Sequence, residues 1–390
     1  MKFIKFFSLW VILCFLFNLS LGVNAAQIYT EDSYVSNLEK SFDCTSAILI
    51  EKETGKVLFE QNADEALPPA SVTKIMTLLL VMEAIETGKI SLNDMVTASA
   101  HACSMGGSQI YLEEGETMSV EDMIKSVVIA SANDAAVALA EHIAGTEEAF
   151  VQMMNQRANE LGMKNTNFEN TNGLDDTAEN HVTSARDIAI MSAKLLSYEK
   201  ITEYSSIWMD TVRNGEFGLT NTNRLVRFYK GANGLKTGST SKAKFCISAS
   251  AERDGMTLIA VIMAAPTRDI RNAAATALLD YGFANYTLYK DSSGVPKEVS
   301  VLGGMKDSVM LEKASFSAVV EKTKLSDITT KVDIPEKVTA PIYKGDKIGS
   351  VSYYCGDELM GSYDVISGED VVKISFMSLL AKIFAAMSLV

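Results

Sequence analysis

The stretch Pro68–Leu80, which reads PPASVTKIMTLLL, sets two prolines directly before an uninterrupted helix-forming run. Ser71 and Lys74 are three residues apart at the start of this run, so on a helix their side chains lie on one face, one turn apart. The first turn of a helix also has free backbone N–H groups and the positive end of the helix dipole, which favour a developing negative charge. The sequence therefore predicts that Ser71 is a nucleophile and that Lys74 is its base.

The Ser-x-x-Lys pattern is common by itself, and it occurs four times in this chain, beginning at Ser71, Ser197, Ser239 and Ser241. A motif match is only a hypothesis until its structural context agrees. After Ser71 the run is apolar on nearly every side, which is typical of a helix buried in the middle of a domain. A nucleophile at the end of such a helix would be held rigidly. The choice among the four matches depends on the rest of the chain.

Length and composition limit the possible classes of protein. A chain of 390 residues is long enough for about two domains and a large core. With 47% hydrophobic and 22% charged residues, the composition is that of an ordinary folded protein. The net charge of −14 argues against nucleic-acid binding, because phosphate groups require a basic surface.

The N-terminus has the pattern of a secretory signal over residues 1–26. Lys2 and Lys5 form its charged start, residues 6–17 are almost wholly apolar, and Val23-Asn24-Ala25 offers small residues for cleavage. An uncleaved membrane anchor is the alternative, although the apolar run is short for a spanning helix. We therefore expect a protein that works at the extracytoplasmic face of the cell membrane or in the cell wall space.

Cysteines and histidines give no sign of a metal site. Beyond the signal there is no C-x-x-C pair and no ligand spacing, and the three histidines are scattered. Export would permit disulfides, but the spacing chooses no pairing among the cysteines and leaves their redox state open. We expect no metal and no cofactor. The residues concerned are Cys44, Cys103, Cys246, Cys355, His101, His142 and His181.

Hydrophobic periodicity predicts a domain in which a helical middle separates two groups of strands. The first group is a hairpin, and the last group is expected to pair with it in a mostly antiparallel sheet. The predicted fold class is therefore α/β (α+β). The predicted strands are 46–51, 57–60, 243–251, which residues 234–238 precede, and 257–263, and the predicted helices are 71–87, 119–144 with a break at 130–134, 147–161, 183–196 with Thr183 as N-cap, and 269–285.

We expect four segments along the chain: a signal peptide (1–26), a catalytic domain (27–287), a small β-rich domain (288–369) and an amphipathic helix (370–390). The last segment is mostly apolar with Lys373 and Lys382 interspersed, a pattern that suits a helix lying on a membrane surface. A core helix that closes the β-rich domain is the alternative. A spanning helix is disfavoured because two lysines lie within the run.

Two further motifs select the first Ser-x-x-Lys match. Ser71-Val72-Thr73-Lys74 is followed by Ser131-Ala132-Asn133 and then by Lys236-Thr237-Gly238, which precedes a predicted strand. Ser-x-Asn also occurs at Ser91, whereas Lys-Thr-Gly occurs once. The three motifs in this order are typical of class A β-lactamases and penicillin-binding proteins.

The chemistry of acyl transfer explains the residue types in the first two motifs. A serine hydroxyl is a poor nucleophile and needs an adjacent base. A lysine can be that base only if burial and nearby positive charge lower its pKa, and Lys236 supplies such a charge if it faces Lys74. Ser131 can relay a proton to the leaving group, and the Asn133 amide can orient both Lys74 and a substrate carbonyl.

The third motif suits substrate binding. Lys236 and Thr237 can bind a carboxylate, and Gly238 allows a strand backbone to approach the acyl group closely. The backbone N–H groups of Ser71 and Ser239 are expected to form an oxyanion hole.

Beyond the three motifs, residues 44–285 resemble the serine-type D-alanyl-D-alanine carboxypeptidases, the low-molecular-mass penicillin-binding proteins of peptidase family S11. The resemblance implies a β-lactamase/transpeptidase-like catalytic domain with a helical subdomain, and Arg271 matches a family arginine near the substrate carboxylate. Lys244 is a departure, because many members have glycine there. The matching segments are Gly106-Gly107-Ser108, Gly115, Ile129–Ala135, Asn172-Gly173-Leu174, Thr183–Asp187 and Asn233–Gly238.

The resemblance implies removal of the terminal D-alanine from peptidoglycan stem peptides through an acyl-enzyme, and covalent acylation by β-lactam antibiotics. A class A β-lactamase is the alternative enzyme, which would need a deacylating glutamate, with Glu169 the nearest candidate. A catalytically silent wall-binding protein is the alternative from another class. The sequence leaves open the oligomeric state, any minor transpeptidase activity, and a vegetative or sporulation role.

Overall fold

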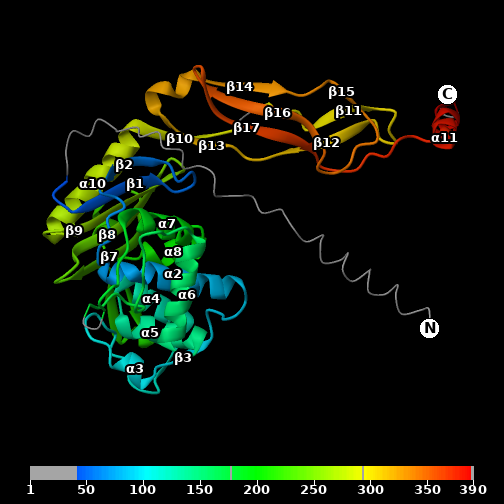
Figure 1. Ribbon diagram of the computed structural model, residues 1–390. Helices are drawn as coiled ribbons and strands as arrows, with labels where there is room; N and C mark the ends of the chain where they lie inside the picture. Colours follow the sequence, from blue (N-terminus) through cyan, green and yellow to red (C-terminus); the bar gives the residue numbers. More distant parts are fainter. Residues whose placement is uncertain (1–41, 176–177, 292–293, 388–390) are drawn as a thin grey trace, which may run out of the picture. The chain divides into compact units, whose positions relative to one another are not determined.

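The central sheet joins the first and the last strands of the catalytic part. The computed structural model describes residues 42–175, 178–291 and 294–387, so the predicted signal at 1–26 lies outside the described residues. Within them, one antiparallel sheet has the order β2-β1-β9-β8-β7 (Figure 1). Pairing of β1 with β9 confirms the expected meeting of the two strand groups. The strands are β1 (Ser46–Glu51), β2 (Val57–Gln61), β7 (Ala232–Thr240), β8 (Lys244–Arg253) and β9 (Met256–Ala265).

Helices cover both faces of this sheet. Helix α10 packs on one face, and the helical layer around α2 and α7 packs on the other (Figure 1). This explains why β9 is apolar along nearly its whole length, since a strand buried on both faces needs no alternation. The helical segments are η1 (Ala70–Thr73, a 3₁₀ turn), α2 (Lys74–Glu86), α3 (Ala100–Cys103), α4 (Val120–Ile129), α5 (Asn133–Ala144), α6 (Glu147–Glu160), α7 (Ala185–Leu195), α8 (Glu199–Ser205), η2 (Arg213–Gly215), α9 (Leu225–Phe228) and α10 (Arg268–Asn285).

Helix α2 is the buried central helix that its sequence predicts. Ten of its thirteen residues are buried, from Lys74 to Ala84. Each large apolar side chain among them contributes roughly 1.5–3 kcal/mol by leaving water. A side chain at the N-terminal end of α2 is therefore held by the best-packed part of the domain.

Two predicted helix starts were wrong by a short distance. Ser71 lies in η1, and the α-helix begins only at Lys74. The expected cap Thr183 instead pairs its backbone with Leu67, and the Ser184 hydroxyl accepts the N–H of Asp187 at 3.1 Å as the cap of α7. Serine and threonine are both favoured as N-cap residues, and the backbone pairing of Thr183 leaves Ser184 as the cap.

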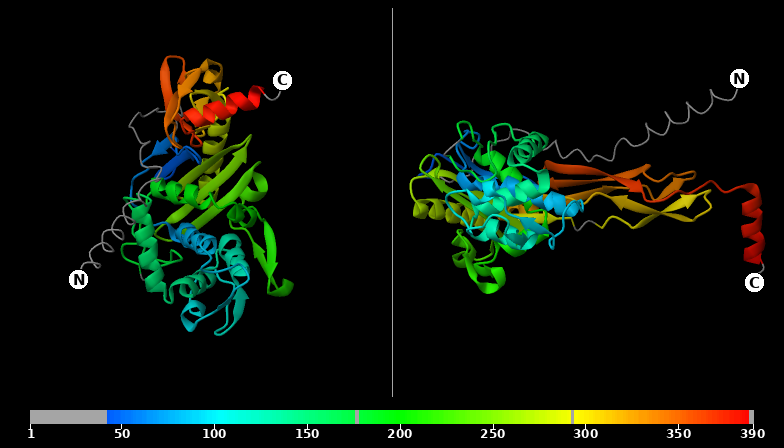
Figure 2. Two further views of the ribbon diagram at one scale, coloured as in Figure 1. Left: turned by 90° about the vertical axis from the view of Figure 1, so that its right-hand side faces the viewer. Right: turned by 90° about the horizontal axis from the view of Figure 1, so that it is seen from below.

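The remaining strands of the described residues form two-stranded sheets and one six-stranded sheet with the order β14-β16-β17-β12-β11-β15 (Figure 2). Residues 298–367 make an all-β unit with two small apolar cores, around Val309 and around Tyr353. This unit agrees with the predicted β-rich character of the segment. The strands are β3 (Met95–Thr97) with β4 (Thr117–Ser119), β5 (Met209–Val212) with β6 (Phe217–Thr220), β10 (Tyr286–Lys290) with β13 (Ser317–Glu321), and β11 (Glu298–Leu302), β12 (Ser308–Lys313), β14 (Ile328–Asp333), β15 (Lys337–Thr339), β16 (Lys347–Cys355) and β17 (Glu358–Ser367), with a 3₁₀ turn η3 (Lys322–Asp327).

The C-terminal helix α11 (Phe376–Met387) carries exposed apolar side chains. Phe376 and Met377 are about three-quarters exposed, at 74% and 73%, and Phe384 is 67% exposed. Among the helices of the described residues, none has both the length and the apolar character needed to cross a bilayer. The described residues contain four cysteines, all as free thiols. Within these described residues, no group of three or more His, Cys, Asp or Glu side chains is placed to hold a metal ion.

Lys244 carries backbone strain at the start of β8. Its φ is +54°, in the left-handed region that favours glycine, and it faces Thr240 across the β7–β8 turn. This conformation costs a non-glycine residue about 1–2 kcal/mol.

We expect Lys244→Gly to raise the free energy of unfolding by about 0.5–1 kcal/mol, after the larger chain entropy of glycine in the unfolded state offsets part of the relief. Lys244→Ala removes the charge and keeps the strain, so it is the matched control. Urea denaturation midpoints measure the difference. A Lys244→Gly protein that is less stable than Lys244→Ala would contradict this prediction.

Candidate active site

Ser71 and Lys74 meet at the junction of η1 and α2. The Ser71 Oγ lies 3.0 Å from the Lys74 Nζ, although η1 is a tighter turn than the predicted α-helix. Lys74 is fully buried, whereas Ser71 is half-buried and so remains open to a substrate. The structure thus brings the predicted nucleophile and base into hydrogen-bonding distance.

Two oxygen acceptors hold the Lys74 amine. Its Nζ lies 2.5 Å from Asn133 Oδ1 and 2.7 Å from the backbone oxygen of Asn172. The Asn133 amide cannot turn round, because its Nδ2 donates to the backbone oxygen of Gly106 at 2.6 Å. A neutral amine has two N–H donors and one lone pair. With both donors given to these oxygens, the lone pair faces Ser71, as a general base requires.

Burial sets the protonation state of Lys74. Loss of hydration is the largest cause and the positive charge of Lys236 the next, and together they hold the pKa of Lys74 well below its ordinary value. The Asp134 carboxylate acts in the opposite direction, but it is occupied by the backbone N–H groups of Ile110 and Leu112. The neutral amine is therefore favoured, in agreement with the predicted role of burial and of Lys236.

Ser131 is held in place by Lys236. The Lys236 Nζ donates to Ser131 Oγ at 2.9 Å and to the backbone oxygen of Thr237 at 2.9 Å. Ser131 has φ +64°, a left-handed conformation that is strained for serine and is found most often at functional sites. The short polar segment that leads into α5 therefore places Ser131 against Lys236 and Asn133 against Lys74.

The carboxylate side of the site carries buried positive charge. Burial, and then the neighbouring Arg271, lower the pKa of Lys236 to about 7. Arg271 is only 3% exposed, so it is not an ordinary surface arginine. Its guanidinium donates to Asn272 Oδ1 at 2.8 Å and to the backbone oxygen of Cys246 at 3.4 Å. A bound carboxylate would stabilise both cations.

Strand β7 runs close against the nucleophile turn. A Cβ at Gly238 would lie 2.7 Å from the Pro69 oxygen and 2.9 Å from the Ser71 nitrogen, so only glycine fits here. The glycine thus allows the strand to approach η1 itself, which the sequence did not indicate. Beside it, Thr237 donates its hydroxyl to Thr222 Oγ1 at 2.8 Å, and Ser239 is exposed.

Several residues of the site were missed by sequence reasoning. Most of them act through backbone oxygens or close approach, which leave no residue-type pattern, and Thr222 acts through a side-chain hydroxyl outside the three motifs. Gly173 is an example: its φ is +84°, and a Cβ there would overlap the carbonyl of Ala70. The others are Gly106, Asn172 and Thr222. The Asn172-Gly173-Leu174 segment was noted only as a resemblance.

This arrangement suits acyl transfer. It combines a serine hydroxyl, a buried amine of lowered pKa 3.0 Å away, and cationic groups that can bind a carboxylate. The acid–base steps of acyl transfer need proton acceptors and donors close to the nucleophile, and the side chains of this site can supply them.

Comparison with known families agrees with this chemistry. Residues 33–267 match the sequence model of the D-alanyl-D-alanine carboxypeptidase family S11. Residues 283–373 match the C-terminal domain of penicillin-binding protein 5.

Individual relatives share most of the chain. A D-alanyl-D-alanine carboxypeptidase of Bacillus subtilis, DacF, is 44% identical over 351 residues, which are 88% of this chain and 90% of the relative. The structure of penicillin-binding protein 5 from Haemophilus influenzae superposes with a TM-score of 0.73 at 33% identity, over 86% of this chain and 99% of that one. Penicillin-binding protein D2 of Listeria monocytogenes, solved in its ampicillin-bound form, is 32% identical, with a TM-score of 0.58 over 63% of this chain and 98% of that one.

Proposed function

Because this chain belongs to the D-alanyl-D-alanine carboxypeptidase family S11, we propose that it releases the terminal D-alanine of peptidoglycan pentapeptides through an acyl-enzyme on Ser71. The observation that carries this assignment is the Lys74 amine, which is buried, held by Asn133 and Asn172, and 3.0 Å from Ser71 Oγ. The residue roles that follow are part of the proposal.

In acylation, Ser71 Oγ attacks the carbonyl carbon of the penultimate D-alanine while Lys74 Nζ takes the hydroxyl proton. The C–N bond to the terminal D-alanine then breaks, and its nitrogen receives a proton through Ser131. Water later attacks the ester carbonyl and restores Ser71. The backbone N–H groups of Ser71 and Ser239 stabilise the oxyanion in both steps.

The terminal carboxylate of the substrate binds at Lys236 and Thr237, and the neighbouring Arg271 adds a second positive charge. Their positive field supports the binding of an acidic C-terminus over an amidated one. A carboxylate also raises the pKa of Lys236, so substrate binding favours its charged form.

The same nucleophile is expected to be acylated by β-lactams, whose strained amide occupies the place of the D-Ala-D-Ala peptide bond. Hydrolysis of that adduct is expected to be slow. Glu169, the deacylating candidate for a β-lactamase, is exposed, and its Oε2 accepts the backbone N–H groups of Glu179 and Asn180 at 2.8 and 3.0 Å. It therefore caps a loop, which argues against the β-lactamase alternative. Fast turnover of nitrocefin without lasting acylation would reverse this ranking.

We further propose the predicted domain division and an extracytoplasmic location at the membrane surface. Support comes from the peptidoglycan substrate and from the exposed Phe376, Met377 and Phe384 on α11. Deletion of residues 370–390 should release the exported protein from sedimented membranes without loss of activity. Continued sedimentation of the truncated protein with membranes would refute the anchor.

The proposed activity is tested by incubating the purified protein with a pentapeptide that ends in D-Ala-D-Ala and measuring free D-alanine. A peptide that ends in D-Ala-L-Ala is the control. Stoichiometric release from the first peptide alone is expected. No release by the wild-type protein would overturn the assignment and favour the silent wall-binding alternative.

A further inference from the structure

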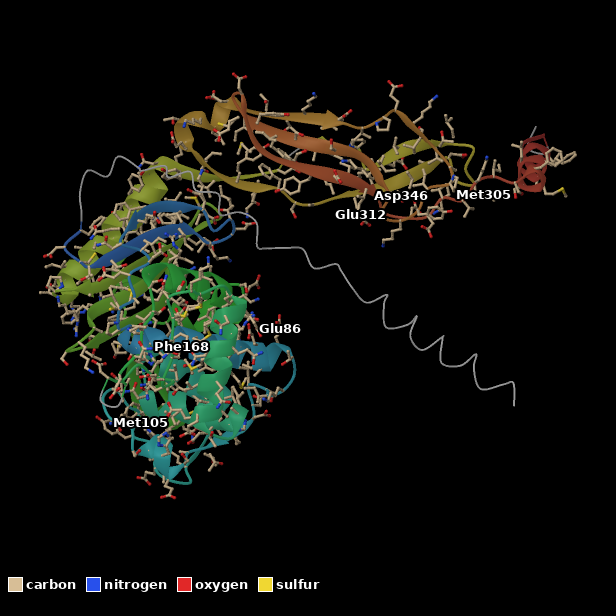
Figure 3. All side chains as sticks on the ribbon, viewed as in Figure 1. Glu86, Met105, Phe168, Met305, Glu312 and Asp346 are labelled. Atoms are coloured by element: carbon tan, nitrogen blue, oxygen red, sulfur yellow. The ribbon has the colours of Figure 1, made fainter. Side chains whose placement is uncertain are left out.

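A buried histidine outside the three motifs contacts the nucleophile turn. His181 is 6% exposed, and its Nε2 lies 2.7 Å from the Oγ1 of Thr73, which stands between Ser71 and Lys74 in the chain. Its ring also packs edge-on against Phe168, with 5.7 Å between ring centroids (Phe168 is labelled in Figure 3). A buried histidine with these contacts either only packs in the core or helps to position Ser71.

The hydrogen bonds assign the proton of the imidazole. Thr73 Oγ1 donates its only proton to the Ala70 oxygen at 2.8 Å, so the 2.7 Å contact must use a proton on His181 Nε2. The other ring nitrogen, Nδ1, accepts the backbone N–H of Glu169 at 3.0 Å. The neutral ring protonated at Nε2 satisfies both contacts, whereas a charged ring would turn an N–H at Nδ1 against the N–H of Glu169.

The loop that begins at Glu169 supplies part of the base site. Thr171 accepts through its backbone oxygen from Thr77 Oγ1 at 2.6 Å, and Asn172 accepts from Lys74 Nζ at 2.7 Å. Gly173 then packs against the carbonyl of Ala70. His181 thus joins the start of this loop to the turn on which the loop packs.

Charged groups surround His181 on several sides. Glu169 and Asp175 favour its charged form, and Lys74 disfavours it. A cavity of about 50 Å³ beside the ring is lined also by Glu179 and Lys242. Burial outweighs the two carboxylates and lowers the pKa of His181 to about 4, so the ring is neutral at pH values well above 4.

We propose that His181 is a positioning residue for acylation, which ties Thr73 to the loop of Asn172 and so fixes Lys74 relative to Ser71. The inference rests on the proposed function. It differs from a packing role because it acts through two hydrogen bonds, from Nε2 to Thr73 and from the Glu169 N–H to Nδ1.

A double-mutant cycle tests this role. His181→Phe keeps an aromatic ring and loses both hydrogen bonds, and Thr73→Val removes the hydroxyl with little change in shape. We expect each to lower kcat/KM for D-alanine release by roughly 10–100-fold, the effect of an ångström-scale displacement of reacting groups. The double variant should be no worse than about twofold below either single one. His181→Gln, which keeps an N–H near the Nε2 position, should recover most of the loss.

The pH profile gives a second readout. Burial is the main cause of the low pKa of Lys74, so a loosened loop that admits water should raise it. The acid limb of kcat/KM for His181→Phe is then expected to move to higher pH by about half a unit or more. His142→Gln, at an exposed histidine of α5, should leave rate and profile unchanged.

Three results would overturn the proposal. The first is wild-type kinetics in His181→Phe, and the second is that His181→Phe lowers kcat/KM by the same factor in the wild-type protein and in Thr73→Val. The third is a lower kcat/KM in His181→Phe with an acid limb at the wild-type pH. If His181→Phe fails to fold, the cycle is run with His181→Asn, which keeps the acceptor for Glu169 and loses the contact to Thr73. An inactive wild-type protein would instead overturn the proposed function, so the two failures are distinguishable.

Discussion

Ser71→Ala is expected to lower the release of D-alanine by roughly 10⁴-fold or more, because it removes the hydroxyl that lies 3.0 Å from the Lys74 amine. The half-buried hydroxyl contributes one hydrogen bond to the fold, so the free energy of unfolding should change by only about 1 kcal/mol. Activity is measured with the D-Ala-D-Ala pentapeptide, and stability by thermal denaturation.

Ser197→Ala is the matched control, since Ser197 begins another Ser-x-x-Lys match. Its lysine, Lys200, is paired with Glu203 at 2.6 Å and is partly exposed, so it remains charged and cannot serve as a base. Full activity is expected for this variant. Undiminished D-alanine release by Ser71→Ala would rule out the mechanism.

Lys236→Gln is expected to have the second largest effect, a loss in kcat/KM of roughly 10²–10³-fold, because a buried charge that binds the substrate carboxylate is removed. The variant should also change the pH dependence. The charge of Lys236 lowers the pKa of Lys74, so without it the pKa of Lys74 rises and more of the amine is protonated at a given pH. The acid limb of the acylation profile should therefore move to higher pH.

The direction of this shift holds in the relevant range. Lys236 has a pKa of about 7, so below that pH it is charged, and its removal there raises the pKa of Lys74. Lys242→Gln, at an exposed lysine in the turn after β7, is the control and should leave the limb in place. A loss of rate with an unmoved acid limb would mean that Lys236 only binds substrate.

Much of the site could be predicted because its chemistry depends on residue type. A serine, a lysine and an asparagine at fixed spacing are visible in the sequence, and the order of Ser71, Ser131 and Lys236 chose one Ser-x-x-Lys match of four. The paired strands β1 and β9 were predictable from their apolar runs. The 3₁₀ form of η1 was not predicted, and neither was the close approach of Gly238 of β7 to this turn, which is a contact between distant segments.

Sequence reasoning missed the contacts of the site that are made by backbone atoms or that depend on the packing of distant segments. The backbone carbonyl of Asn172 accepts a hydrogen bond from Lys74. Because every residue has a backbone carbonyl, the residue type at this position does not indicate the role. Arg271 matched a family position, but only the packing of α10 on the sheet buries it and directs its charge to Lys236. His181 was one of three scattered histidines until its contact with Thr73 was known.

The central claim is that Ser71 forms the acyl-enzyme, and mass spectrometry after brief incubation with ampicillin tests it most directly. The intact protein should gain the mass of one antibiotic molecule, and digestion should place the adduct on the peptide that contains Ser71. An adduct on a peptide with Ser131, Ser239 or another serine, or no adduct on a folded protein that releases D-alanine, would contradict the account.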